Sequence, residues 1–470
     1  MKYLDRLLKI KENKGKILIV GLGKENQQFL EWATKVVGIA KESISISDQK
    51  LINNTEYTTY TGLNYLDCLS DQFDIVVKAP GIWSLKPELE AYRTKNGQDS
   101  IISSMVFFLE SFRDNILMVT GTKGKTTTSS WTKEILQKTS PNLKVEYCGN
   151  TSNISPYQFW NNLEQSLDNY IFVIETSSFQ LQDLGYSGYS PKYAIITNLF
   201  IDHLDQHKDK EEYWQAKENI FLYQNQEDFL VITDQVAEVL KNYQISIPSQ
   251  TQIINQAKIQ ELIKTYHDVS FIGNHNWSNL ALVISVVNII ICKDNDYYKL
   301  VKELIPPKGR LELVRTIKKS QNIVNIYNDN TATEPDAIIA ALKSLCDGKD
   351  SQTILILAGK IKKSEYQELI NLTKSYLRRS KILKIYYFGP LGQLLQKAIE
   401  NKQNSKEDIK INLLKEFLDL PYNLKTILKQ AKTQNINILF SPGGSSFDEF
   451  DNYSIREECY LNWVKRIGHE

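Results

Sequence analysis

The segment from Gly121 to Thr127 reads Gly-Thr-Lys-Gly-Lys-Thr-Thr and has the residue types of a loop that binds phosphate groups. Glycines let backbone N–H groups turn inward around phosphate oxygens, and a following helix adds the positive end of its dipole. Lys125 is expected to reach the β- and γ-phosphates of ATP, and the Thr126 hydroxyl to bind Mg²⁺. The candidate ATP-binding residues of this loop are Gly121, Thr122, Lys123, Gly124, Lys125, Thr126 and Thr127.

Two further side chains could serve the same site. Glu175 comes directly after the apolar run 171–174, and a carboxylate at the end of such a strand can hold a second metal ion. The alternative for Glu175 is a surface acid. Lys217, taken by its residue type and neighbours alone, is a solvated helix lysine. An unimportant Gly-Lys turn remains the alternative for the loop itself, but the strand before it and the helix after it favour ATP binding.

Strands that would position the phosphate loop and its neighbours are predicted by three short apolar runs, 16–20, 115–119 and 353–357. Each run is followed by glycines and a helical stretch. Runs that are apolar throughout are typical of strands buried on both faces, and their alternation with helices predicts parallel α/β sheets. Even spacing of the three predicts three domains, which we place at 1–113, 114–306 and 307–470. Further strands are expected at 43–46, 73–77, 144–148, 171–174, 193–197, 229–232, 385–388 and 436–440.

Composition argues against several other classes of protein. The chain has 470 residues and a formal net charge of +1, so no global field draws it to nucleic acid or to an anionic membrane. The longest apolar run, Leu280–Cys292, is too short to span a bilayer and predicts a buried helix. Five scattered cysteines without metal-binding spacing favour reduced thiols in a cytoplasmic protein. We expect no nucleic-acid partner, no membrane insertion and a monomer.

The phosphate loop lacks the first glycine of the longer GxxxxGK pattern, and this shorter variant resembles that of the Mur ligase family and its folylpolyglutamate synthase relatives. The resemblance extends over nearly the whole chain. It implies a three-domain architecture in which a Rossmann-like N-terminal domain binds a UDP-linked substrate. A central P-loop domain would bind ATP, and a Rossmann-like C-terminal domain would bind the incoming amino acid.

In the central region, the resemblance implies roles for several residues. The Gly149-Asn150 turn is similar to one beside the reacting carboxylate, although a plain turn is the alternative. Asn198–Asp205 is similar to a segment whose histidine, here His203, binds magnesium, and Lys217 matches a lysine that is carbamylated in the family. Asn276 and Asn279 match asparagines that face the nucleotide; Asn276 could also be a helix N-cap, and both roles are compatible. The implied catalytic set is Lys125, Asn150, His203 and Lys217, and the set for two Mg²⁺ ions is Thr126, Glu175, His203 and carbamylated Lys217.

The two ends of the chain would hold the substrates. The N-terminal turn after the first strand resembles one that contacts the UDP pyrophosphate, and Asp48 matches an acid that contacts uracil. In the C-terminal region, segments around Arg310 and Asp329 resemble those that reach ATP, and Ser441–Tyr453 resembles the signature of the glutamate-adding branch. The implied UDP-substrate set is Gly21, Leu22, Gly23, Asp48, Ser177 and Gln180, and the glutamate set is Thr333, Lys362, Ser446, Phe447 and Tyr453.

Together these matches imply ATP-dependent ligation of D-glutamate to UDP-N-acetylmuramoyl-L-alanine through an acyl phosphate, in cytoplasmic peptidoglycan precursor synthesis. A sibling ligase that adds L-glutamate, and folylpolyglutamate synthase, remain alternatives. The chain also departs from the family pattern. Asn26 replaces a usual glycine, Thr331 a usual lysine and Gly309 a usual histidine, while Gly443 and Gly444 replace other small residues and would loosen their turn. Asn26 and Thr331 motivate a third alternative, a catalytically weakened nucleotide-binding regulator.

Overall fold

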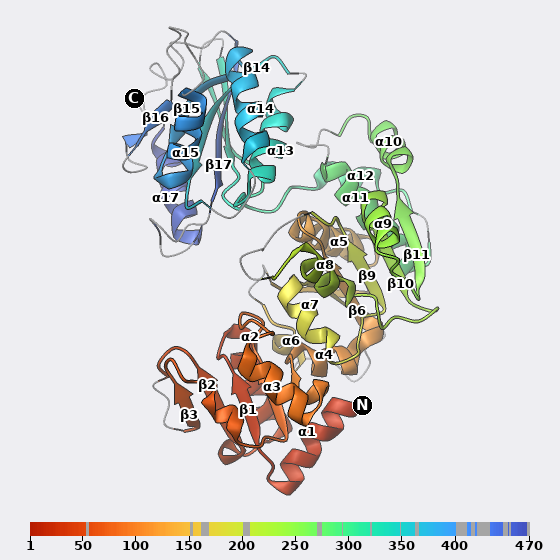
Figure 1. Cartoon of the computed structure of the whole chain (residues 1–470). Helices are drawn as coiled ribbons and strands as arrows, with labels where there is room; N and C mark the ends of the chain where they lie inside the picture. The colour runs from red at the N-terminus through yellow and green to blue at the C-terminus, as the bar shows by residue number, and fades with distance from the viewer. Residues whose placement is uncertain are drawn as a thin grey trace. The chain divides into compact units, whose positions relative to one another are not determined.

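The computed structural model describes residues 1–52, 56–150, 154–160, 169–200, 207–269, 275–293, 295–319, 322–347, 349–361, 366–400, 411–414, 419–420, 433–444, 450 and 453–467. The chain divides into two compact units (Figure 1). The first contains residues 1–268 and 277–303 and carries two sheets. The second contains residues 269–276 and 304–470 and carries the third sheet.

The first sheet has the parallel strand order β3-β2-β1-β4-β5, which is the doubly wound arrangement expected of a Rossmann-like domain. The order reverses beside β1, since the chain passes from β3 at one edge back to β4 on the other side of β1. Loops that follow β1 and β4 therefore diverge and leave a crevice at their carboxyl ends. The elements are α1 (Lys2–Asn13), β1 (Ile17–Val20), α2 (Lys24–Trp32), β2 (Ile44–Asp48), β3 (Thr58–Thr61), β4 (Ile75–Lys78), α3 (Pro87–Asn96), β5 (Ile101–Ile102) and α4 (Met105–Phe112).

The second sheet is also parallel and has the order β11-β10-β9-β6-β8-β7. Strand β6, which leads into the phosphate loop, lies between β8 and β9, so the carboxyl ends of these three strands surround the loop. The elements are β6 (Ile116–Thr120), α5 (Lys125–Thr139), β7 (Lys144–Gly149), α6 (Tyr157–Trp160), β8 (Tyr170–Glu175), α7 (Ser178–Gly185), β9 (Tyr193–Ile196), α8 (Lys210–Glu218), β10 (Phe229–Thr233), α9 (Asp234–Asn242), β11 (Gln250–Ile254), α10 (Gln256–Thr265), α11 (His275–Ile291) and α12 (Tyr298–Glu303).

The third sheet has the order β12-β13-β17-β14-β15-β16 and is mixed, because β12 runs antiparallel to β13. The expectation of purely parallel sheets is therefore wrong for this pair. Only two residues separate β12 from β13, and so short a connection can join only antiparallel strands. The elements are β12 (Glu312–Lys319), β13 (Asn322–Asn328), α13 (Pro335–Cys346), β14 (Ser351–Ala358), α14 (Gln367–Arg378), β15 (Ile382–Tyr387), α15 (Gly389–Glu400), β16 (Ile411–Leu413), β17 (Asn435–Gly443) and α17 (Tyr453–Arg466).

Apolar side chains alternate between the two faces of the third sheet and meet different helices. Leu355 and Leu357 of β14 pack with residues of α13, α14 and α15. Ile354 and Ile356 of the same strand pack on the other face with Tyr460 and other residues of α17. Because successive side chains of a strand point to opposite faces, a strand that is apolar at every position must be covered on both.

In the first unit, one continuous apolar core joins the first two sheets. Aromatic side chains contact one another within it, and the rings of Phe29 and Phe107 stack with centroids 5.3 Å apart. Phe108, on α4, meets Phe172 of β8 edge to face at 4.9 Å. The first and second sheets are therefore fixed to each other by a buried core. The boundaries at 113/114 and 306/307 lie between successive sheets, and we retain them as a proposal. Among the described residues, no helix is long and apolar enough to cross a membrane.

Candidate active site

The phosphate loop connects the end of β6 to the first residue of α5, so the backbone N–H groups of the first turn of α5 face the loop. Gly121 and Gly124 have φ angles of 143° and 85°, which favour glycine. A side chain at Gly121 would also lie 1.9 Å from the Thr197 hydroxyl. Lys125 folds back over the loop and donates to the carbonyls of Gly121 and Thr122 at 2.9 and 3.0 Å. The loop thus lies between a strand and a helix, as predicted, with glycines at its two positions of positive φ.

The segment after β9 holds this loop in place. Asn198 accepts from the Lys123 N–H at 2.8 Å through its side chain and from the Thr122 N–H at 3.0 Å through its carbonyl. Its amide group also donates to the Lys123 carbonyl at 3.0 Å. Three hydrogen bonds from one asparagine fix the loop, which lowers the entropy that nucleotide binding must remove. The predicted magnesium ligand His203 lies outside the described residues.

Glu175 ends β8 directly beside β6, where it pairs in register with Val119. Its side chain is only 1% exposed, so the surface-acid interpretation is wrong. Tyr147 donates to the carboxylate at 2.9 Å and orients it. Asn150 begins the turn that follows β7, and its N–H donates to the Glu175 carbonyl at 2.9 Å. The structure therefore brings Glu175 and Asn150 together at adjacent strand ends.

Lys217, on α8, is 1% exposed, so the interpretation as a solvated helix lysine is wrong. Its ammonium donates to the Gly121 carbonyl at 3.0 Å and lies 4.6 Å from the ring centroid of Tyr213. The Tyr213 hydroxyl in turn donates to the Thr122 hydroxyl at 3.2 Å. Lys217 is therefore buried against the phosphate loop itself.

Glu175, Thr126 and Lys217 are not equally suited to bind a metal ion. Magnesium prefers one or two carboxylates together with phosphate and water oxygens. Glu175 and Thr126, both buried at the loop, supply such oxygens. The unmodified ammonium of Lys217 would repel a cation, and only carbamylation would make it a ligand. No cluster of three or more His, Cys, Asp or Glu side chains suited to a metal is found among the described residues.

Asn276 and Asn279 lie one turn apart in the first turns of α11 and are both buried. Because α11 begins at His275, Asn276 is inside the helix and is not its N-cap. A side chain at Gly124 would lie 2.5 Å from the Asn279 amide oxygen. Asn279 thus lies directly against the phosphate loop. That both asparagines face the nucleotide stays a prediction.

The crevice at the ends of β1, β2 and β4 contains a cavity of about 320 Å³. Asp48 lies at the end of β2 and accepts from the Leu22 N–H at 2.7 Å and from the Lys50 N–H at 2.8 Å. Asn26, which replaces a usual glycine, is fully buried and donates to the Gly21 carbonyl at 2.9 Å. It therefore stabilises the turn after β1. The cavity is lined by Gly21, Gly23, Lys24, Glu25, Asp48, Gln49, Lys50, Tyr65, Ala79, Pro80, Gly81 and Ile82.

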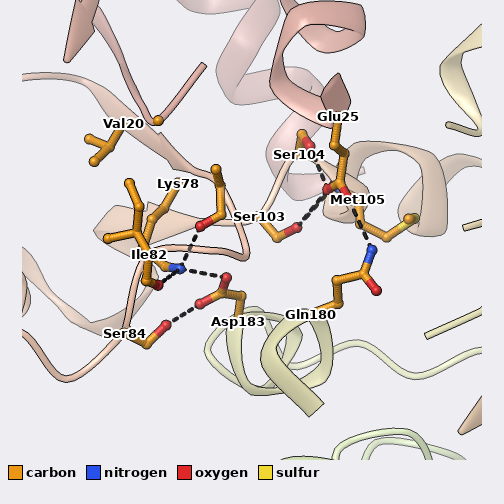
Figure 2. A network of polar contacts seen from close by, with 12 residues as sticks. Val20, Glu25, Lys78, Ile82, Ser84, Ser103, Ser104, Met105, Gln180 and Asp183 are labelled. Carbon is orange, nitrogen blue, oxygen red and sulfur yellow. Dashed lines mark hydrogen bonds and ion pairs between the residues drawn. The ribbon is translucent and has the colours of Figure 1, made fainter. Parts of the chain in front are cut away.

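Helix α7 links this cavity to the central site. Its N-cap Ser177 and Gln180 form a capping box, so each side chain accepts from the other's backbone N–H. The Gln180 amide also donates to the Glu25 carboxylate at 3.1 Å, across the first two domains (Figure 2). Glu25 was missed from the sequence, because nothing in its neighbourhood signals a partner 155 residues away.

The pKa of Glu25 is raised above its usual value, since burial disfavours its charged form more than the hydrogen bonds from Gln180 and Ser104 favour it. When the pKa of a carboxyl group is higher in the folded state than in the unfolded state, its protonation stabilises the fold. The protein loses that stabilisation as pH rises from about 4.5 through the raised pKa. We therefore expect Glu25→Gln to raise the melting temperature relative to the wild type at pH 8. That advantage should disappear near pH 4. Glu31→Gln, at an exposed position of the same helix, is the control and should show no such trend. A lower melting temperature for Glu25→Gln at pH 8 would contradict the argument.

In the second unit, the Asp329 carboxylate accepts from the Leu311 N–H at 3.0 Å and from the Ser441 hydroxyl at 2.8 Å. It therefore joins the segment that follows Arg310 to the end of β17. Two of the residues that depart from the family pattern contact each other: the Thr331 hydroxyl donates a hydrogen bond to the Gly309 carbonyl at 2.8 Å. Thr331 thus has a local structural role in place of a charge.

The predicted glutamate residues are only partly described. Thr333 lies in the loop before α13, and Tyr453 begins α17. Lys362, Ser446 and Phe447 lie outside the described residues. The expectation that the glycine pair at 443–444 loosens its turn is wrong. A side chain at Gly443 would lie 2.2 Å from Ile338, and one at Gly444 would lie 2.5 Å from the Lys360 carbonyl, so this turn is closely packed.

Known proteins resemble this chain over most of its length. The family model of the Mur ligase middle domain matches residues 119–287. UDP-N-acetylmuramoylalanine–D-glutamate ligase of Clostridium botulinum is 28% identical, with 96% of this chain and 97% of that protein covered. The protein of the same name from Oenococcus oeni is 27% identical, with 86% and 88% covered.

Two solved structures share the fold. UDP-N-acetylmuramoylalanyl-D-glutamyl-2,6-diaminopimelate–D-alanyl-D-alanyl ligase from Acinetobacter baumannii is 14% identical, with a TM-score of 0.55 and 98% of both chains covered. The MurF ligase of Thermotoga maritima, solved in complex with ADP, is 15% identical, with a TM-score of 0.54 and 96% and 95% covered. Together with the three sheets, these likenesses confirm the expected three-domain α/β architecture.

Proposed function

Because this chain belongs to the Mur ligase family, we propose that it joins D-glutamate to UDP-N-acetylmuramoyl-L-alanine with the use of ATP. The observation that carries the proposal is the likeness to D-glutamate ligases over 96% of the chain, which includes the second unit. Within the first unit, a phosphate cradle and a crevice at a Rossmann-like switch point supply sites for ATP and for a UDP-linked acceptor. We place the reaction in the cytoplasm, in peptidoglycan precursor synthesis.

The chemistry requires a carboxylate to become electrophilic. The alanine carboxylate attacks the γ-phosphorus of ATP, ADP leaves, and an acyl phosphate forms. The amine of glutamate then attacks the acyl carbon, and the tetrahedral intermediate expels phosphate and leaves an amide bond. The protein contributes mainly positioning and charge neutralisation to such phosphoryl transfer.

The loop residues act on the phosphates in this proposal. Backbone N–H groups of 121–127 and the N-terminus of α5 hold the β- and γ-phosphates. Lys125 leaves the carbonyls of Gly121 and Thr122 and neutralises charge that develops on the transferred group. Asn150, fixed to the Glu175 carbonyl, orients the alanine carboxylate for attack.

Thr126, Glu175, His203 and carbamylated Lys217 would hold two Mg²⁺ ions, which would neutralise phosphate charge when bound. The buried Glu175 carboxylate, oriented by Tyr147, supports this assignment. For the incoming amino acid we propose Thr333, Lys362, Ser446, Phe447 and Tyr453. We propose that Asn276, Asn279, Arg310 and Asp329 contact the nucleotide.

The acceptor would lie with its UDP group in the crevice that Gly21, Leu22, Gly23 and Asp48 border. The first turn of α2, directly after the turn that follows β1, would present backbone N–H groups to the pyrophosphate, and Lys24 and Lys50 add positive charge at the same cavity. Ser177 and Gln180, at the N-terminus of α7, lie on the side toward the phosphate loop and would contact the remainder of the substrate.

The test is to incubate the protein with UDP-N-acetylmuramoyl-L-alanine, ATP, Mg²⁺ and each glutamate enantiomer separately, and to follow phosphate release and product mass. We expect release and a glutamyl product with D-glutamate only. A product with L-glutamate alone would indicate the sibling ligase. Nucleotide binding without release from either enantiomer would overturn the proposal and favour the regulatory alternative.

A further inference from the structure

Lys78 is a fully buried lysine to which the proposed reaction gives no role. It ends β4, and no part of its side chain is exposed. A buried ammonium is unfavourable unless it is paired and fully hydrogen-bonded, so its environment must satisfy it. A lysine at the end of the apolar run Ile75–Val77 was the only sequence signal for it.

Three oxygens surround the Lys78 ammonium (Figure 2). It donates to the carbonyls of Ala79 at 2.9 Å and Ile82 at 2.7 Å, and it pairs with the Asp183 carboxylate at 2.8 Å. The Ser84 hydroxyl donates to the other oxygen of Asp183. The two carbonyls belong to the loop that follows β4, so Lys78 closes this loop upon itself.

The contact between Lys78 and Asp183 joins the wall of the acceptor cavity to α7, the helix that leads to the phosphate loop. Ala79 and Ile82 are the ends of the loop that lines the acceptor cavity. Asp183 lies on α7, which begins three residues after Glu175. Figure 2 shows Glu25 and Gln180 bridging the same two parts of the molecule beside Lys78 and Asp183. One wall of the cavity and the helix that leads to the central site are therefore fixed to each other at two points.

We propose that Lys78 is a positioning residue for the acceptor: anchored by Asp183, it holds the 79–82 wall of the cavity in its binding conformation relative to α7. This rests on the proposed function, which places the UDP group in that cavity. Without Lys78, the Ile82 carbonyl would need water or another donor, and the Ala79 carbonyl would keep only its 3.2 Å hydrogen bond from the Ile82 N–H. The loop would then be less ordered before the substrate arrives. Substrate binding would then include the entropy of ordering the loop.

A purely structural role makes a different prediction. Replacing both members of a buried ion pair with apolar residues often leaves stability unchanged or higher, whereas removing one member leaves an unpaired buried charge. The double variant Lys78→Met/Asp183→Leu therefore removes the two hydrogen bonds to the loop without leaving one member of the ion pair unpartnered. If the pair only stabilises the fold, acceptor affinity should be unaffected in this variant.

The experiment measures the Kd of UDP-N-acetylmuramoyl-L-alanine and of ADP by calorimetry. In Lys78→Met/Asp183→Leu we expect the acceptor Kd to rise roughly tenfold and the ADP Kd to stay within about twofold. The control is Lys138→Met/Glu303→Leu, a surface pair with the same 2.8 Å separation, which should change neither. An unchanged acceptor Kd in the folded double variant, or an equal loss of ADP affinity, would overturn the inference.

Hydrogen exchange of the wild type supplies a test that does not depend on the variant folding. UDP alone, which lacks the part of the acceptor proposed to contact Ser177 and Gln180, should slow exchange in 79–84 and also in α7, which is not part of the cavity lining. Slowing in 79–84 alone would overturn the inference and leave the proposed function intact. A wild type that does not bind the acceptor at all would overturn the proposed function, and this inference with it.

Discussion

Lys125→Ala is expected to lower kcat by at least about a thousandfold, because the variant loses the cation that neutralises the transferred phosphoryl group. The Lys125 ammonium lies over the loop and donates to two of its carbonyls, so it is already aimed at the space the phosphates would fill. Phosphate release under saturating ATP, acceptor and D-glutamate measures the effect. Circular dichroism and the melting temperature should remain close to wild type, since α5 is anchored by its buried residues.

The matched control for this prediction is Lys133→Ala, which removes a lysine from the same helix two turns further on. It should leave kcat within about twofold, since charge beyond the first turn contributes little to the phosphate site. Lys125→Arg keeps the charge but changes the geometry, and an intermediate kcat is expected. Wild-type turnover in Lys125→Ala would show that this loop is not the ATP site.

The central strands could be predicted from the sequence because both their faces are buried. Strands β1 and β6 are apolar at nearly every position, and β14 is apolar from Ile354 to Ala358. The structure places all three within one or two residues of the predicted runs. Edge strands carry a weaker signal, although one of them, β7, was predicted as the run 144–148. Strand β3 reads Thr-Thr-Tyr-Thr and β11 is mostly exposed, so neither was predicted. A strand with one free edge needs few apolar residues, and its assignment depends on its neighbour.

The phosphate loop was predictable for a similar local reason: its glycines, its lysine and its hydroxyls lie within seven consecutive residues. Contacts between distant segments were not. Asp183 is 105 residues after Lys78 in the sequence, and no local pattern links them. Family resemblance identified Glu175 and Lys217, but only the structure shows that both are buried. Burial removes the surface interpretations that residue type alone left open.

For the residues that depart from the family pattern, comparison with the family suggested a defect where the structure shows a stabilising contact. Asn26 and Thr331 suggested weakened sites when each was compared with the family residue in isolation. In the structure, Asn26 fixes the Gly21 carbonyl, and Thr331 fixes the carbonyl of Gly309, itself a departure. A substitution whose partner has also changed can preserve local geometry. Neither departure removes Lys125, Glu175 or Lys217 from the site.

Lys217→Ala is expected to lower kcat by about a hundredfold or more, and added short-chain carboxylates should restore part of that activity. The side chain is buried against the phosphate loop, where a carbamate would present oxygens to a metal ion and an ammonium would repel it. Acetate or propionate can enter the space left by the lysine and supply the missing oxygens. Turnover measured against carboxylate concentration, at constant ionic strength, checks this.

The carboxylate response separates the two possible forms of Lys217. If the residue acts as an ammonium, short amines should restore activity in Lys217→Ala and carboxylates should not. Lys210→Ala, which removes an accessible lysine from the start of the same helix, should turn over like the wild type and respond to neither additive. Wild-type turnover of Lys217→Ala without additive would refute any role for this side chain. Restoration by carboxylates alone would support carbamylation, because an ammonium contributes no oxygen that a carboxylate could replace.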